Sequence, residues 1–166
     1  MRIFGLAGWS GSGKTTLMTA LIPEFVSRGV TVSTIKHAHH AFDIDQPGKD
    51  SWRHREAGAL EVMVASERRW ALMHELRDAP EPSLDELVQR MSPVDLLLVE
   101  GFKRHPHFKI EVHRPSLGKP LLHPDDRFVV AIASDERPPK FSVPWFPLSD
   151  AGGIATFMLR YDGIVR

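Results

Sequence analysis

The sequence contains no cysteine, no excess of either charge and no long apolar run. The absence of cysteine excludes disulfide bonds, thiolate catalysis and zinc sites built from cysteine. Basic and acidic residues number 21 each, so no broad charge would attract nucleic acid or an anionic membrane. No apolar stretch is long enough to cross a bilayer, and the early run IFGLAG is too short for a signal peptide. These absences predict a soluble, cytoplasmic protein, and 166 residues suffice for one domain with a sizeable core.

Hydrophobic patterning predicts an α/β fold with a mostly parallel sheet. Nearly continuous apolar runs at 3–7, 95–101 and 128–134 suit strands buried on both faces, and the β-branched stretch 30–36 suits another. Helical spacing predicts helices over 14–28, after a capping box at Ser83, and over 151–160. The alternating stretch 61–76 predicts a β-hairpin turning near Glu67, with an amphipathic helix as the alternative. The stretch 108–113 also alternates and predicts an edge strand.

The first predicted strand and helix are joined by the segment GWSGSGKTT, residues 8–16. Gly8, Gly13, Lys14 and Thr15 match G-x-x-x-x-G-K-[ST], the phosphate-binding loop. Glycines let successive backbone N–H groups point inward, and the positive end of the following helix favours a polyphosphate. Lysine supplies a point charge for the terminal phosphates, and the Thr15 hydroxyl is suited to Mg²⁺. The segment predicts a nucleoside triphosphate site formed by Gly8, Ser10, Gly11, Ser12, Gly13, Lys14, Thr15 and Thr16.

A magnesium ion beside the phosphates needs a further carboxylate from a neighbouring strand. The predicted strand DLLLVEG offers Asp95 and Glu100. Ligands of parallel sheets lie beyond the carboxyl ends of the strands, where Glu100 is placed. Asp95 is five residues earlier, roughly 16 Å away at about 3.3 Å per residue. We therefore predict Glu100 as a Mg²⁺ ligand together with Thr15, or as the group that orients the attacking water.

Several segments together resemble the MobB-type adapter proteins of molybdopterin guanine dinucleotide biosynthesis. They are GWSGSGKTTL, TIKHAHHAFDIDQPGKDSWRHREAGA, ERRWAL, DLLLVEGFK and AIASD, and the second carries most of the resemblance. The resemblance implies a single P-loop NTPase-type domain over residues 1–166, which binds GTP with Mg²⁺ and hydrolyses it weakly. It also implies a homodimer formed through β-structure. The implied partner is a MobA-type guanylyltransferase that joins GMP to molybdopterin, with molybdopterin itself a further candidate ligand.

The same resemblance assigns roles to acidic residues outside the phosphate loop. The segment 36–50 corresponds to a region that senses the γ-phosphate in related GTPases, so Asp43, Asp45 and Asp50 are candidates for the metal or the water, with Asp50 also a possible helix cap. Asp135 follows the strand 128–134, where the acid of the N-K-x-D guanine motif is expected. The preceding Asn and Lys of that motif are absent here. We expect Asp135 to read guanine by accepting hydrogen bonds that adenine does not donate.

Two other functions fit the same phosphate loop. A small-molecule kinase supplies arginines from a mobile lid, and Arg53 and Arg55 are available for that role. A metal-delivery GTPase is suggested by the histidines at 37, 39 and 40, although their spacing fits no standard zinc pattern. Trp9 is unusual inside a phosphate loop because it is large and apolar, and we expect it to stack on a neighbouring segment or a partner.

Overall fold

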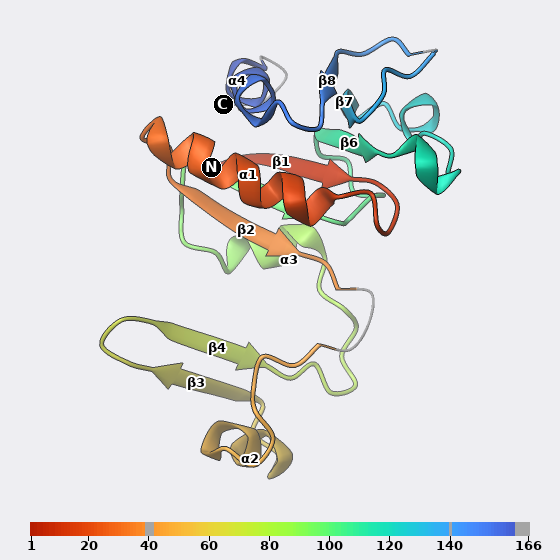
Figure 1. Ribbon diagram of the computed structural model, residues 1–166. Helices are drawn as coiled ribbons and strands as arrows, with labels where there is room; N and C mark the ends of the chain where they lie inside the picture. Colours follow the sequence, from red (N-terminus) through yellow and green to blue (C-terminus); the bar gives the residue numbers. More distant parts are fainter. Residues whose placement is uncertain (39–41, 140, 162–166) are drawn as a thin grey trace. The chain divides into compact units, whose positions relative to one another are not determined.

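The computed structural model describes residues 1–38, 42–139 and 141–161 (Figure 1). One domain is predicted from the sequence, whereas the contacts within the chain divide it into two compact units. The first unit comprises residues 1–37 and 91–166, and the second comprises residues 38–90. Each unit is described separately.

The first unit is organised by a parallel sheet. Among the described residues it has six strands in the order β2 (Val32–Lys36), β5 (Leu96–Glu100), β1 (Arg2–Ala7), β6 (Lys109–His113), β7 (Val129–Ser134) and β8 (Trp145–Pro147), every neighbouring pair running parallel. Short 3₁₀ turns at Pro115–Leu117 and His123–Asp125 connect β6 to β7. Parallel pairing brings the carboxyl ends of β1, β2, β5, β6 and β7 to one edge of the sheet, which predicts a ligand site there.

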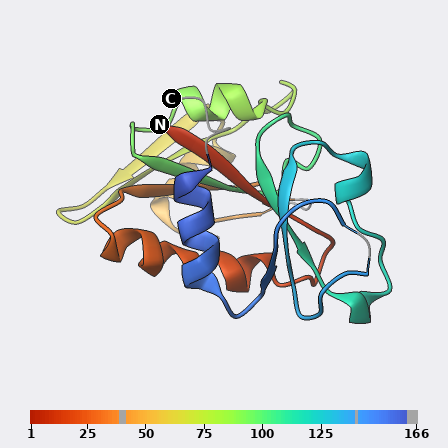
Figure 2. The same cartoon turned by 90° about the horizontal axis from the view of Figure 1, so that it is seen from above.

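Two helices cover one face of this sheet, α1 (Lys14–Ser27) and α4 (Ala151–Arg160), and they pack against each other (Figure 2). Their apolar stripes join the strands in one core. Fully buried members include Phe4 of β1, Phe25 of α1, Leu98 of β5 and Ile154 of α4. Asp150 caps α4 by accepting a hydrogen bond from the Gly153 N–H at 2.9 Å. The core fixes the start of α1 against the end of β1, where the phosphate loop lies.

Strand β6 lies inside the sheet, between β1 and β7, so the predicted edge strand was wrong. The alternation of 108–113 misled because its polar members are buried: Lys109 is 1% exposed and Glu111 is 0% exposed. Both charges are satisfied by loops. The Lys109 ammonium donates to the Lys103 and His105 carbonyls and to Asp126, at 2.9 to 3.1 Å. Glu111 accepts from the backbone N–H groups of residues 122 and 123.

The second unit contains α2 (Asp50–Glu56), the antiparallel pair β3 (Glu61–Ala65) and β4 (Trp70–His74), and α3 (Leu84–Gln89). The predicted hairpin is thus confirmed over the helical alternative, with its turn at 66–69. The predicted capping box is confirmed at Ser83, whose hydroxyl accepts from the Glu86 N–H while the Glu86 carboxylate accepts from the Ser83 N–H. The prediction of Asp50 as a cap was wrong, because Lys49 occupies the cap position and Asp50 begins the helix.

The predicted fold class is confirmed: a parallel sheet flanked by helices, with an additional β-hairpin. The predicted strands and helices recur with ends shifted by one or two residues, and the last helix matches its prediction. No helix in the described part of the chain is both long and apolar enough to cross a membrane.

Candidate nucleotide site

The segment 8–13 forms a tight loop between β1 and α1, and its shape requires glycine at two points. At Gly8 the backbone has φ +151°, and a Cβ would meet the Val112 carbonyl oxygen at 2.3 Å. At Gly13, immediately before the helix, φ is +97°, a left-handed conformation that side chains disfavour. The predicted motif therefore has the backbone geometry that its glycines imply.

The loop and the first turn of α1 present donors that are suited to an anion. The first N–H groups of a helix have no intrahelical acceptor. At α1 the cap residue Gly13 supplies no side-chain hydrogen bond, and the first turn holds no acidic residue that would compete with a phosphate. The buried Ser12 hydroxyl also has no hydrogen-bond partner among the described residues. Unpartnered donors beside a positive helix end are what a polyphosphate needs.

Lys14 extends its ammonium back over the loop and donates to the carbonyls of Gly8 and Trp9 at 3.1 and 2.9 Å. Partial burial lowers the pKa of Lys14, Glu100 opposes that shift, and the nearby charges of Lys103 and Lys36 add to it. A cation that is desolvated and surrounded by like charges gains from a bound anion more than a solvated one does. The position of Lys14 thus fits the predicted phosphate contact.

Thr15 and Glu100 meet at the edge of the sheet. The Thr15 hydroxyl donates to Glu100 Oε1 at 2.9 Å, and Glu100 is the last residue of β5, in register with Leu6 of β1 and Lys36 of β2. Two hard oxygen donors at this spacing are suited to Mg²⁺, which keeps several waters and takes few protein ligands. Asp95 lies before β5 and accepts hydrogen bonds from Thr31 instead, in agreement with the choice of Glu100.

Asp135 follows β7 and lines a hollow of about 380 Å³ beside the start of α1, together with Gly13, Thr16, Arg114 and Ser149 among others. Arg114 links this acid to the phosphate loop. Its guanidinium donates to Asp135 Oδ2 at 2.8 Å and to the Ser12 carbonyl at 3.1 Å. A base-sized space that has a carboxylate and adjoins a phosphate loop can hold the base of a nucleotide.

Arg114 was not among the predicted site residues. No motif marks it, since it follows β6, whose predicted place at the edge of the sheet would have kept it away from the phosphate loop. Its position one residue beyond the carboxyl end of a central parallel strand is the signal that would have indicated it.

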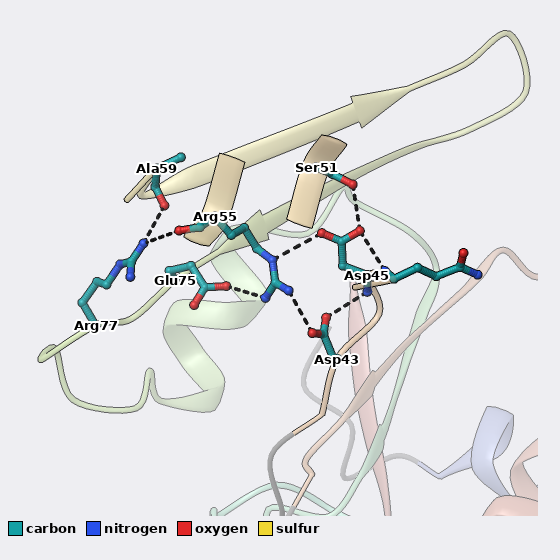
Figure 3. Close-up of polar contacts among 8 residues, drawn as sticks. Asp43, Asp45, Ser51, Arg55, Ala59, Glu75 and Arg77 are labelled. Carbon is teal, nitrogen blue, oxygen red and sulfur yellow. Dashed lines mark hydrogen bonds and ion pairs between the residues drawn. The ribbon is translucent and has the colours of Figure 1, made fainter. Parts of the chain in front are cut away.

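The acids of the second unit form a network around Arg55 (Figure 3). The Arg55 guanidinium contacts Asp43 at 2.8 Å, Asp45 at 3.3 Å and Glu75 at 3.0 Å. Hydrogen bonds from the Asp45 N–H and from Arg55 lower the pKa of Asp43. Ser51 donates to Asp45, so both carboxylates already have partners. Arg55 is likewise engaged and is not a free lid arginine, while the roles predicted for Asp43, Asp45 and Asp50 toward metal or water stay predictions.

The suggested histidine metal site lies mainly outside the described residues, because positions 39 to 41 are not described. The His37 ring stacks on Phe102 with centroids 4.6 Å apart. Within the ranges that the structure describes, no group of three or more His, Asp or Glu is arranged to hold a metal. Trp9, for which stacking was expected, contacts a neighbouring segment by a hydrogen bond instead: its indole N–H donates to the Pro120 carbonyl at 2.8 Å.

Comparison with known proteins identifies the family. The profile of MobB, described as molybdopterin guanine dinucleotide synthesis protein B, matches residues 3–135. This chain belongs to the MobB family. It is 44% identical over 162 residues to the molybdopterin-guanine dinucleotide biosynthesis adapter protein of Escherichia coli strain K12, covering 96% of this chain and 92% of that relative. It is 48% identical over 136 residues to the adapter protein of the same name from Haemophilus influenzae, covering 80% and 74% of the two chains.

Solved MobB structures share the fold. A crystal structure of molybdopterin-guanine biosynthesis protein B superposes with TM-score 0.75 at 31% identity and covers 95% of this chain and 96% of its own. Bacillus subtilis MobB gives TM-score 0.74 at 23% identity, with 96% of each chain covered, and supports the fold alone. Membership of the MobB family and the P-loop NTPase-type fold, both expected from the sequence, are confirmed.

Proposed function

We propose that the chain is a cytoplasmic GTP-binding adapter with weak GTPase activity, which acts in molybdopterin guanine dinucleotide biosynthesis beside a MobA-type guanylyltransferase. The names of its relatives support the pathway and the adapter role. The observation that carries the nucleotide part is the juxtaposition at the end of β1: a glycine loop, an uncapped helix N-terminus, Lys14, and the Thr15–Glu100 pair at 2.9 Å.

In this proposal the loop residues Gly8 and Ser10 to Thr16 hold the phosphates, and Thr15 and Glu100 hold Mg²⁺ directly or through water. The metal, when bound, supplies charge neutralisation at the phosphates. Glu100 and Asp50 are the candidates for orienting water.

Preference for guanine is assigned to Asp135. Its carboxylate accepts from Arg114 through one oxygen, and its second oxygen accepts no hydrogen bond from the described residues. Guanine donates from N1–H and from its exocyclic amine, which adenine cannot match. Discrimination by hydrogen bonds to a charged group can be large, because a base that lacks these donors leaves the carboxylate without them.

The test is calorimetric titration with GTP and with ATP, each with Mg²⁺. Lys14→Ala should abolish GTP binding while its circular dichroism spectrum and melting temperature stay those of a folded protein. Asp135→Asn should reduce the GTP-over-ATP preference by about tenfold or more, since one hydrogen bond to a charged group contributes about 1.5–3 kcal/mol. Arg137→Ala, a change at an exposed residue of the same loop, is the control. Undiminished affinity in Lys14→Ala would refute the proposed phosphate site.

The homodimer is assigned to the hairpin of the second unit. Residues paired directly across an antiparallel hairpin share a face, and one face carries Met63, Leu72 and Trp70. Their exposures are 61%, 44% and 66%, unusual for large apolar side chains. On the other face Val62 is buried, while Val64 is 47% exposed. Covering the exposed face with a second copy would remove this apolar surface from water.

Sedimentation equilibrium tests this assignment. The wild type is expected to be dimeric at micromolar concentration, and Met63→Lys should shift it to monomer without loss of hairpin secondary structure. Adding a purified MobA-type guanylyltransferase, with and without GTP, shows whether a complex forms and whether nucleotide changes its affinity. A monomeric wild type would rule out the hairpin dimer, and an unaltered sedimentation profile with the enzyme would rule out the partnership.

A further inference from the structure

A second hollow, of about 800 Å³, lies next to the phosphate loop and is not used by the proposed nucleotide site. Two aromatic rings line it, those of Trp9 and Phe128. Three cationic side chains also line it, those of Lys103, Arg104 and Arg127. It shares no lining residue with the hollow at Asp135. A ligand could therefore occupy it while a nucleotide is bound.

The cations of this hollow are available to an anion. Lys103 places its ammonium 4.8 Å from the centroid of the Trp9 ring, and Arg127 places its guanidinium 5.0 Å from that of Phe128. Within the described part of the chain, Lys103, Arg104 and Arg127 form no ion pair with an acidic residue. A cation resting over an aromatic face can turn to a phosphate and leave that face to a flat ring.

Of the two acidic side chains that line the hollow, one is already neutralised. Asp126 accepts from the ammonium of Lys109 at 2.9 Å, and Asp125 is exposed. A further lysine, Lys119, lies 5.8 Å from the Trp9 ring centroid. The surroundings therefore keep an excess of positive charge although the chain as a whole has none.

The loops that line the hollow are held by the two buried charges of β6. Lys109 binds the carbonyls of Lys103 and His105, which fixes the segment carrying the cations. Glu111 accepts from the N–H groups of Leu122 and His123, which fixes the opposite wall. Burying a charged group is costly unless its hydrogen bonds are made. Here the partners are mostly backbone groups of the two loops, so these hydrogen bonds hold the loops in place. The hollow is thus preorganised and does not depend on mobile surface side chains alone.

Trp9 connects the hollow to the nucleotide site. Its indole lines the hollow, while its backbone carbonyl accepts from the ammonium of Lys14 at 2.9 Å. Lys103 is also close enough to depress the pKa of Lys14. Occupancy of the hollow and of the phosphate loop would therefore act on the same loop backbone and the same charges.

We propose that this hollow binds a flat, phosphorylated heterocycle of the pterin class, with its ring on Trp9 and its phosphate among Lys103, Arg104 and Arg127. The inference rests on the proposed function, whose product joins a nucleotide to a phosphorylated pterin. Aromatic stacking selects the ring and the unpaired cations select the phosphate, so neither part alone should bind as well.

The experiment is calorimetric titration of the full chain with 6-(hydroxymethyl)pterin phosphate, without nucleotide and with saturating GTP and Mg²⁺. Arg137 is the control for Arg127, because each guanidinium lies over a phenylalanine ring but only Arg127 lines the hollow. Arg127 lies 5.0 Å from the Phe128 centroid and Arg137 lies 5.3 Å from the Phe141 centroid. Arg127→Ala and Lys103→Ala should each weaken binding about tenfold, as expected for loss of a charge-assisted contact. Arg137→Ala should leave it unchanged. Trp9→Leu should weaken the pterin phosphate more than it weakens inorganic phosphate.

The outcomes separate this inference from the proposed function. GTP affinity is measured on the same samples as pterin phosphate affinity. Loss of GTP binding would refute the proposed function, and loss of pterin phosphate binding would refute this inference. Binding of pterin phosphate that is lost in Lys14→Ala and kept in Lys103→Ala would place it in the phosphate loop and overturn the inference. Equal affinity for inorganic phosphate and pterin phosphate would overturn the role of Trp9. Melting curves check that each variant is folded, and Lys103→Gln replaces Lys103→Ala should the latter melt early.

Discussion

Replacing His107 with glutamine should remove a pH dependence of stability that we expect of the wild type between about pH 6.5 and pH 5. His107 is 7% exposed, and its Nε2 has no hydrogen-bond partner among the described residues. Burial lowers the pKa of His107 to about 4, and the nearby charges of Lys109 and His105 act in the same direction. The unfolded chain, by contrast, protonates this ring near the ordinary histidine pKa of about 6.5.

The sign follows from proton linkage. Because the folded-state pKa is the lower one, the unfolded state binds the proton first as pH falls. The contribution of His107 is fully present above about pH 6.5 and is lost progressively toward pH 4. With pKa values of about 6.5 and 4, the loss reaches about 2 kcal/mol by pH 5. Because some solvent reaches the ring, this is an upper figure, and we expect a loss of about 1–2 kcal/mol.

Urea denaturation followed by far-ultraviolet circular dichroism, at several pH values over this range, supplies the measurement. The free energy of unfolding of His107→Gln should fall less steeply with decreasing pH than that of the wild type, by about 1–2 kcal/mol over the range. His54→Gln, in which an exposed imidazole of α2 is removed, reports any general effect of losing a histidine. Identical pH profiles for wild type and His107→Gln would show that this ring is not held neutral by the fold.

Two other substitutions test the framework of the site. Gly8→Ala should lower the free energy of unfolding by about 2 kcal/mol or more and abolish GTP binding, because its Cβ would overlap the Val112 carbonyl. Gly29→Ala is the control: it also has positive φ but lies in open space, so it should lower the free energy of unfolding by only about 1 kcal/mol. Lys109→Met keeps the volume but takes the ammonium away from Asp126 and from the Lys103 and His105 carbonyls, so it should lower the free energy of unfolding by about 3 kcal/mol, against about 0.5 or less for the exposed Lys119→Met. A near-neutral Lys109→Met would contradict the structural role given to this buried ion pair.

The elements that sequence predicted well are those whose pattern has a local cause. The glycine loop is dictated by backbone geometry, and the capping box of Ser83 by hydrogen bonds within four residues. The place of Glu100 at the end of β5 was predicted by counting residues along a strand, which works because parallel strands are extended and end together. In each case the information needed lies within a few residues of the feature.

The features that were missed depend on contacts distant in sequence. β6 was predicted at the wrong place in the sheet because alternating polar residues usually indicate a solvent-exposed face. Only the loops at 103–105 and 122–126 show that Lys109 and Glu111 are buried and hydrogen-bonded. Arg114 was missed for the same reason: its role depends on where β6 lies. The pairing of Asp43 and Asp45 with Arg55 is also a tertiary fact, which the order of residues does not show.

The misplaced strand is also the most informative about function. Central strands of parallel sheets are usually apolar on both faces, which avoids the cost of burying charge, whereas β6 buries Lys109 and Glu111. Burial also raises the pKa of Glu111, so keeping this carboxylate ionised costs free energy that the two backbone N–H groups only partly offset. What the charges provide, and apolar residues cannot, is a fixed position for two loops on either side of one hollow. Both loops lie beside Trp9 and line the same hollow, and this is the physical reason to look for a second ligand there.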